Sequence, residues 1–433
     1  MQSKTLESKY PLDFRKEEAE ILGQHLHSKH SIELIGMKRV GIGNFLRFFL
    51  THPEVNNLYV RDAKAKLFIT IDLGDLIERE LFAFWRLFLK RLTDTIENME
   101  NFDEEQKKRA STLFLNTIQT GDHFLTLDAV RELLRMISDA GHTPAIFFIK
   151  FDRLKESVTK EFFDNLQSLN DSIQNRLSYI FTSFRSLSKL APFVFPEIEL
   201  NAFTHKMYLK PTNKKDTLIV FQTILDDYKM NLDKQIVDNL IEWSGGHIQF
   251  LELSTVIVHE LMMNKEFEEE NLFEKLKNDE RIQLQAEELI NHLDDNEQEF
   301  LQNIVKNGGE IILDDNNYLI RSGLVTKKKN RFSIFSAYLY EYLKEKIEKS
   351  ETNGETHLTK KEFLLYTLLD ENKNEIIDRE KIEETVWPEY SNYGVSDWSI
   401  DRLVSRLRKK LEGQESEFKI ETIRTRGFRL VSK

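Results

Sequence analysis

The sequence predicts a mixed α/β fold, in which a parallel β-sheet with helices is followed by a helical segment and two smaller units of helices and hairpins. Three observations lead to this class. Short apolar segments alternate with longer amphipathic ones over residues 29–210, as in a sheet with crossover helices. Helical periodicity then continues to about residue 280, and the remaining segments combine helices with alternating stretches around turns. Glycine (16) and proline (7) are scarce, which favours a helix-rich chain.

The elements of the α/β region follow from their periodicity. The run at residues 144–151 is continuously apolar, as expected for a buried central parallel strand. The charged stretch at 97–109 is expected to begin as a loop. Strands are predicted at 31–35, 66–72, 144–151, 177–182 and 206–209, and helices at 44–50, 76–95, 127–140, 157–173, 215–229, 233–243 and 247–263.

These patterns divide the chain into five predicted segments. The acidic, lysine-containing stretch at 264–280 is expected to be a solvated linker or an exposed helical face. The order of elements after it, two helices, a helix end and a hairpin, suits a small winged helix. The segments are a lead-in at 1–28, the α/β domain at 29–210, a helical lid at 211–280, a winged helix at 285–347 and a last unit at 356–433.

Composition limits the classes of function. The formal net charge is −12, so a DNA-binding surface would have to be local. The absence of cysteine excludes disulfides, iron–sulfur clusters and thiolate zinc sites. The first thirty residues contain no apolar core of the signal-peptide type, and the apolar run at 145–149 is too short to span a bilayer. We therefore expect a cytoplasmic protein without a membrane partner.

The last unit combines a cationic helix with a cationic hairpin. Apolar residues at helical spacing would face the core from a helix at 396–411, and basic residues occupy its other side. The stretch IETIRTRGFRLV alternates about Gly427, as in a hairpin. Such a helix fits the major groove of DNA, where arginine can bind guanine edges or phosphates. A charged helix alone is more often a solvated surface. The inward residues would be Ile400, Leu403, Val404, Leu407 and Leu411.

The order and spacing of four stretches favour the DNA-binding interpretation. LTKKEFLLYTLL, IIDREKIEETVW, SDWSIDRLVSRLRKKL and IRTRGFRL together resemble the OmpR/PhoB-type winged-helix DNA-binding domain. The resemblance implies that 396–411 is the recognition helix, that the hairpin is the wing, and that double-stranded DNA is the partner of a dimer on repeated half-sites. No receiver domain is recognised upstream, so phosphorelay control is not expected. The resemblance places Arg402, Ser405 and Arg406 toward bases or flanking phosphates, and Arg408, Lys409, Arg424 and Arg426 toward the backbone.

A second motif, IELIGMKRVGIGNFLRFF, has the order strand, glycine turn and helix of a phosphate-binding loop. Gly36 and Gly41 keep the frame of the G-x-x-x-x-G-K-[ST] pattern, but the lysine position is Ile42 and the hydroxyl position is Gly43. The turn could still offer backbone amides to an anion at a helix N-terminus. The fixed cation and the magnesium-binding hydroxyl are missing, although Lys38 lies nearby in sequence.

The segment AIFFIKFDRL would carry the acidic motif of an ATPase, yet neither possible register supplies a general base. Around both motifs the chain resembles a AAA+/STAND-type P-loop NTPase, which implies a P-loop NTPase-like sheet with a helical lid and ATP or ADP as the ligand. In SGGHIQFLEL, the resemblance implies that a histidine faces the nucleotide; an ordinary helix N-cap is the alternative. The nucleotide-binding candidates are Gly36, Lys38, Gly41, Gly43, Asn44, Asp152 and His247.

The sequence thus predicts a DNA-binding transcriptional regulator that is not an enzyme and whose ATPase-like module has lost hydrolysis. The alternative is a nucleotide-switched STAND ATPase in signalling or defence that uses its winged helix for assembly or DNA sensing. A metal hydrolase is a third option, but the histidines are scattered and HExxH is absent. The one cluster, HLHSKH at His25–His30, is interpreted as a surface helix end and not as a ligand set.

Overall fold

The computed structural model describes residues 5–191, 194, 200, 203–308, 317–328, 331–352, 358, 360–387, 397–413, 417–423 and 426–433. The chain forms two compact units, Met1–Tyr342 and Leu343–Lys433. The finer division into five segments stays a prediction.

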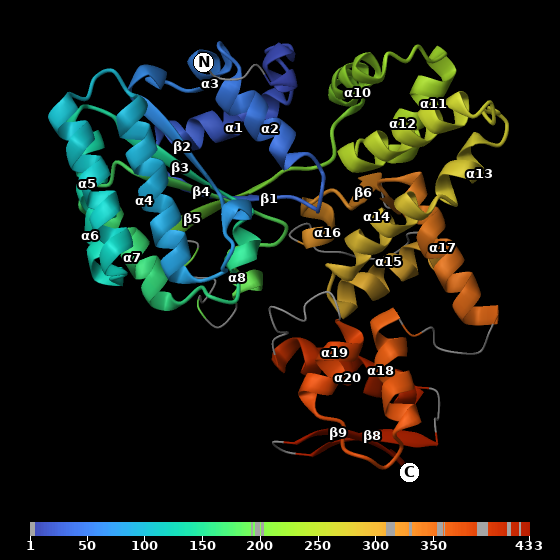
Figure 1. Cartoon of the computed structure of the whole chain (residues 1–433). Helices are drawn as coiled ribbons and strands as arrows, with labels where there is room; N and C mark the ends of the chain where they lie inside the picture. Colours follow the sequence, from blue (N-terminus) through green and yellow to red (C-terminus); the bar gives the residue numbers. More distant parts are fainter. Residues whose placement is uncertain are drawn as a thin grey trace. The chain divides into compact units, whose positions relative to one another are not determined.

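The first unit contains a sheet of five parallel strands in the order β2-β3-β4-β1-β5 (Figure 1). The strands are β1 (Ser31–Ile35), β2 (Lys66–Asp72), β3 (Thr143–Ile149), β4 (Ser178–Ser183) and β5 (Thr204–Tyr208). Every residue of β1 is buried, as is most of β3, because both strands are covered on their two faces. The predicted α/β class with a parallel sheet is confirmed.

Helices connect the strands of this sheet. The segment at 97–109 starts with the last two residues of α4, a turn follows at 99–103, and α5 begins at Glu104, where Asp103 and Gln106 form a reciprocal capping box. Helices α4, α5 and α6 pack on one another beside β2 (Figure 1). The helices are α1 (Lys16–His27), α2 (Ile42–Thr51), α3 (Val55–Tyr59), α4 (Leu81–Asn98), α5 (Glu104–Thr120), α6 (His123–Asp139), α7 (Lys160–Asp171) and α8 (Leu187–Leu190).

The rest of the first unit is mainly helical. The predicted helices at 215–229, 233–243 and 247–263 are confirmed to within a residue. The stretch at 264–280 is not simply a linker, because Leu272 and Leu276 of α13 are buried. The elements are α10 (Lys214–Tyr228), α11 (Lys234–Ser244), α12 (Ile248–Met263), α13 (Leu272–Lys277), α14 (Glu280–Asn291), α15 (Asp295–Asn307), α16 (Tyr318–Arg321), β6 (Val325–Lys328), β7 (Arg331–Ile334) and α17 (Ala337–Thr352).

The second unit has the three helices and the hairpin that its sequence predicts: α18 (Lys360–Glu371), α19 (Arg379–Val386), α20 (Asp397–Gly413), β8 (Phe418–Ile423) and β9 (Gly427–Ser432). Gly427 has a φ of +135°, and a Cβ there would lie 2.0 Å from the carbonyl oxygen of Ile377. Phe428 exchanges backbone hydrogen bonds with Ile377 next to this contact. Glycine is therefore required where the hairpin meets the loop before α19.

Within the described part of the chain, no helix combines the length and the apolar character that crossing a bilayer requires.

Candidate nucleic-acid interface and phosphate-loop region

One side of α20 is fixed in the core of the second unit. Ile400, Leu403, Val404, Leu407 and Leu411 are all buried, so the inward side predicted from their spacing is confirmed. They pack with residues of α18, α19 and the hairpin. The orientation of the helix about its own axis is therefore set by the core, and its remaining side is directed away from it.

Two residues proposed to contact bases lie on that remaining side. Ser405 is exposed and Arg406 is half-buried. The Nε atom of Arg406 is buried without a hydrogen-bond partner. One donor of the Arg406 guanidinium is thus unused within the described residues, although buried donors ordinarily find partners. On the hairpin, Arg426 is exposed.

Arg408 has a role that its sequence position does not reveal. Its Nε donates to the carbonyl oxygen of Ile420 at 2.8 Å, and its Nη2 donates to the Thr422 hydroxyl at 2.7 Å. These bonds tie α20 to β8, so two of its donors are used within the domain. Lys410 likewise pairs with Glu362, which is 1% exposed.

The remaining predicted DNA contacts cannot be described in the same detail. Arg402 and Lys409 belong to α20, but their side chains lie outside the described residues, as does the whole of Arg424.

In the first unit, the glycine turn connects the end of β1 to α2, as a phosphate-binding loop does. Its interior is filled by apolar side chains: a Cβ on Gly36 would lie 2.9 Å from Val40 Cγ1 and 3.2 Å from Ile42 Cδ1. Gly41 has a φ of +104°, and a Cβ there would lie 2.7 Å from Ile248 Cγ1 of α12. The helical lid therefore packs directly on the loop.

The two loop cations pair with a carboxylate of α14. Lys38 Nζ lies 3.5 Å from Glu288 Oε1, and Arg39 Nε donates to Glu288 Oε2 at 3.0 Å. Burial opposes ionisation of Glu288, but the hydrogen bond from Arg39 and the charge of Lys38 together lower its pKa. One carboxylate thus pairs with both of these loop cations.

His247 joins the lid to the loop. It is fully buried and caps α12: its Nδ1 accepts from the Phe250 amide at 3.3 Å, and its Nε2 donates to the Lys38 carbonyl oxygen at 2.8 Å. Burial lowers the pKa of His247 to about 4, so the ring is neutral near pH 7. Both ring nitrogens are used by the protein, in the helix N-cap arrangement that the sequence left as one of two alternatives.

A lysine and an aspartate form an ion pair at the carboxyl ends of β3 and β2. Lys150 follows β3, and its Nζ lies 3.0 Å from Asp72 Oδ2 at the end of β2. Burial raises the pKa of Asp152, although the charge of Lys38 partly offsets this. In one of the two possible alignments of the acidic motif, the position of the general base is therefore Lys150, which pairs with Asp72.

An acidic cavity of about 360 Å³ lies between the lead-in, α2, α10 and α12. Asn44 borders it and donates to the buried Glu7 at 3.3 Å, whereas Gly43 is exposed in the first turn of α2. Asp227 and Glu252 also line the cavity, and burial raises the pKa of Glu252. Arg47 also lines the cavity and pairs with Glu7 at 2.7 Å, so one cation stands against the three carboxyl groups there.

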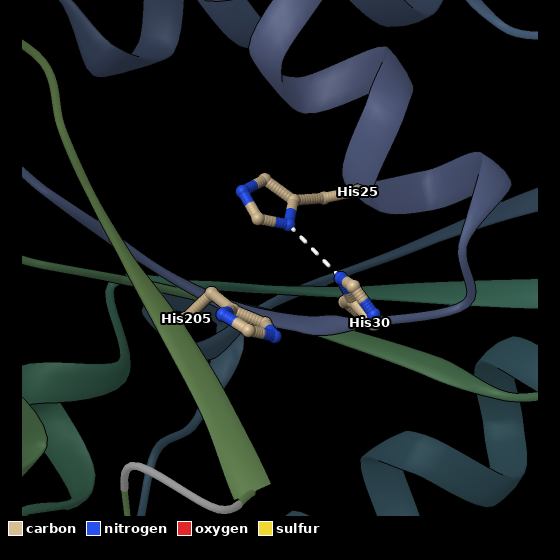
Figure 2. Close-up of side chains that lie close together, drawn as sticks. All are labelled: His25, His30 and His205. Carbon is tan, nitrogen blue, oxygen red and sulfur yellow. Dashed lines mark hydrogen bonds between the residues drawn. The ribbon is translucent and has the colours of Figure 1, made fainter.

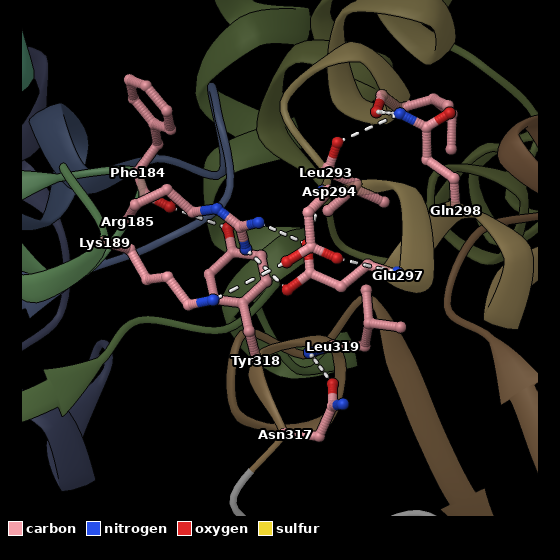
Figure 3. Close-up of polar contacts among 11 residues, drawn as sticks. Phe184, Arg185, Lys189, Leu293, Asp294, Glu297, Gln298, Asn317, Tyr318 and Leu319 are labelled. Atoms are coloured by element: carbon pink, nitrogen blue, oxygen red, sulfur yellow. Dashed lines mark hydrogen bonds and ion pairs between the residues drawn. The ribbon is translucent and has the colours of Figure 1, made fainter. Parts of the chain in front are cut away.

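A buried ion pair fixes the turn after β4 to α15 (Figure 3). Arg185 donates through both terminal nitrogens to the two carboxylate oxygens of Glu297. Its guanidinium also lies 4.0 Å from the centre of the Tyr318 ring, and the Tyr318 hydroxyl donates to the Phe184 carbonyl oxygen at 2.8 Å. No local sequence pattern indicates this contact, because 112 positions separate the charged partners.

Comparisons with known proteins agree with this description of the second unit. Residues 353–430 match the family model of the C-terminal domain of transcriptional regulatory proteins. The response regulator ArlR of Staphylococcus aureus (strain Mu50) is 40% identical over 81 residues, which make up 18% of this chain. The same match is found in strain USA300. The chain spans only 36% of the length of these relatives.

The solved structures that resemble the chain are distant. A Walker-type ATPase of Pyrococcus abyssi is 15% identical, with a TM-score of 0.47 over 76% of this chain and 95% of that chain. The ORC1 protein of Aeropyrum pernix, solved in complex with DNA, is 11% identical, with a TM-score of 0.41 over 96% and 88%. Residues 353–430 thus match an OmpR/PhoB-type DNA-binding domain of transcriptional regulatory proteins, and they follow an α/β unit built on a five-stranded parallel sheet.

Proposed function

We propose that the chain is a DNA-binding transcriptional regulator whose ATPase-like unit serves as a scaffold or sensing domain and does not hydrolyse ATP. One observation carries the DNA-binding part. Within the segment that matches the regulatory family, the core fixes α20 by its apolar side, and the Nε of Arg406 on the other side has no partner among the described residues.

The recognition helix would lie in the major groove with Ser405 and Arg406 near base edges or flanking phosphates. Arg402 and Lys409 share the helix, and Arg426 extends the cationic surface to the wing. Lysine and arginine contacts release counterions, so affinity should fall steeply as salt rises. Arg408 would act mainly by holding α20 on the hairpin, since two of its donors are already bonded there.

Loss of hydrolysis is supported by the loop and its neighbours. Ile42 provides no charge where the motif needs a lysine, and Gly43 provides no hydroxyl for a metal. Val40 packs beside Gly36 in the turn, and Glu288 forms ion pairs with Lys38 and Arg39. These residues do not fit a magnesium–triphosphate, because cation, metal ligand and general base are each missing from their positions.

The DNA-binding proposal is tested by selecting bound sequences from random DNA with the full chain, followed by affinity measurements on the selected site. Arg406→Ala should weaken binding by about 1–3 kcal/mol if Arg406 reads a base. Arg406→Lys should lose most of the same discrimination, because lysine cannot form the bidentate pair. Lys160→Ala changes the net charge equally in the first unit and serves as the control. Unchanged affinity in both Arg406 variants would remove the assignment.

The alternative is a nucleotide-switched STAND ATPase, which the loop's position at the N-terminus of α2 favours. Equilibrium binding of labelled ATP with Mg²⁺, together with an assay of phosphate release, distinguishes the regulator from the ATPase. We expect no phosphate release above background. Release at an enzymatic rate that an Ile42 substitution abolishes would refute the loss of hydrolysis while leaving the DNA-binding proposal intact. Dimerisation on repeated half-sites is also proposed, and the spacing of the selected sites tests it.

A further inference from the structure

Three histidines from separate segments meet beside the edge of the sheet (Figure 2). His25 lies in the last turn of α1, and His30 directly precedes β1. His205 lies on the edge strand β5, which pairs with β1 and sets Ile32 opposite His205. Parallel pairing of the first and last strands therefore brings His205 to the HLHSKH segment, which the sequence analysis interpreted only as a surface helix end.

The spacing of the rings suits one metal ion. The ring centres are 5.5 Å apart for His25 and His30, 5.0 Å for His25 and His205, and 4.4 Å for His30 and His205. The Nδ1 atoms of His25 and His30 lie 3.3 Å apart, and one nitrogen from each ring falls within 4.8 Å of the others. Tetrahedral zinc with Zn–N bonds of about 2.0–2.1 Å needs nitrogens about 3.3–3.4 Å apart. The first pair already meets this distance, and the His205 ring, whose nitrogen lies within 4.8 Å of the other two, would have to move closer to join them.

The protonation state of the cluster is compatible with metal binding. Burial lowers the pKa of His25 and of His30, and the neighbouring His205 lowers each of them further. These shifts favour the neutral form of His25 and His30, and neutral imidazole is the form that coordinates metals. His30 and His205 are exposed, so an ion and a completing water can reach the nitrogens from solvent.

We propose that His25, His30 and His205 bind a divalent transition-metal ion, of which Zn²⁺ is the representative, with water completing the coordination. A set of three imidazoles favours Zn²⁺, Ni²⁺ or Cu²⁺ and disfavours Mg²⁺ and Ca²⁺, which require oxygen ligands. The ion links α1, the turn before β1 and the edge strand β5. Its binding stabilises this corner of the first unit, because the three segments must be folded for the ligands to converge.

The test uses the full chain after chelator treatment and dialysis. Calorimetric titration with Zn²⁺ should show saturable binding at one site per chain, and Zn²⁺ should raise the melting temperature where Mg²⁺ does not. Co²⁺ should give the visible absorption of a nitrogen-coordinated, tetrahedral ion. These readouts are independent of DNA or nucleotide binding, so the proposed function can fail without affecting them.

Variants locate the site. His205→Gln and His30→Gln should each lower Zn²⁺ affinity at least about tenfold, the lower end of what disturbing the supporting residues of a metal site costs. His27→Gln is the matched control. His27 belongs to the same segment, but its Nδ1 lies 3.8 Å from Asp62 Oδ2. Circular dichroism without metal should be the same for all variants, since two of the three rings are exposed. Absence of saturable Zn²⁺ binding, or equal affinity in His27→Gln, His30→Gln and His205→Gln, would overturn the proposal.

Discussion

Replacement of Arg185 by methionine should strongly destabilise the first unit. Arg185 and Glu297 are only 10% and 9% exposed, and two charge-assisted hydrogen bonds join them. Methionine keeps much of the side-chain volume but leaves the Glu297 carboxylate buried without its cation. Breaking one partner of a buried pair costs about 3–5 kcal/mol. We expect a loss of this size in equilibrium urea denaturation of the full chain, followed by tryptophan fluorescence and circular dichroism.

A double variant, Arg185→Met with Glu297→Gln, distinguishes the cost of leaving a carboxylate unpaired from the cost of lost side-chain packing. Glu297→Gln removes the charge but keeps an oxygen for the Asp294 amide, which Glu297 Oε2 accepts at 2.9 Å. Combined with Arg185→Met, it should be more stable than Arg185→Met alone, by about 0.5–3 kcal/mol, the usual range of coupling between residues in contact. Lys189→Met is the control, because Lys189 is 68% exposed and lies 3.8 Å from Asp294. Its cost should stay below about 1 kcal/mol. Equal losses for Arg185→Met and Lys189→Met would refute the reasoning.

Three further changes test other contacts. Gly427→Ala should unfold the second unit at a lower temperature and weaken DNA binding, because its Cβ would collide with the Ile377 carbonyl; calorimetry and a binding titration measure both effects. Lys410→Met should cost more stability than a surface lysine does, since it removes the cation that pairs with Glu362, a residue that is 1% exposed, and paired denaturation curves test this. The pKa of His247 is about 4 in the folded chain, against an ordinary value of 6.5. Between these two pH values only the unfolded chain binds the proton, so the free energy of unfolding should fall as pH drops from 6.5 to about 4. His247→Gln should remove up to about 1.4 kcal/mol per pH unit from that slope in denaturation curves.

Part of the fold is predictable from the chain because the central strand β3 is buried over most of its length and is therefore almost continuously apolar. The run at 144–151 is predicted for this reason, and β3 occupies Thr143–Ile149. Leu403 and Val404 of α20 are likewise predicted to face the core, since a single helical period determines which side is apolar. Helix α5 begins earlier than the charge pattern suggests, because its capping box outweighs the polar character of its first turn.

The site contacts are harder to predict because they depend on which elements become neighbours. His205 joins His30 only when β5 pairs with β1, and strand order is not written in local periodicity. Arg408 was assigned toward DNA from its place on a cationic helix, but its bonds to β8 depend on the packing of the hairpin. Glu288 was not anticipated beside Lys38, because 250 positions separate the two along the chain.

Two contacts hold the glycine turn against α12: Gly41 packs on Ile248, and His247 is hydrogen-bonded to the Lys38 carbonyl. Putting lysine at position 42 and threonine at position 43 would restore the letters of the motif, yet the lid would still lie on the turn. The loop is therefore held in its present form by residues at the start of α12, and substitutions at positions 42 and 43 alone would not change this packing.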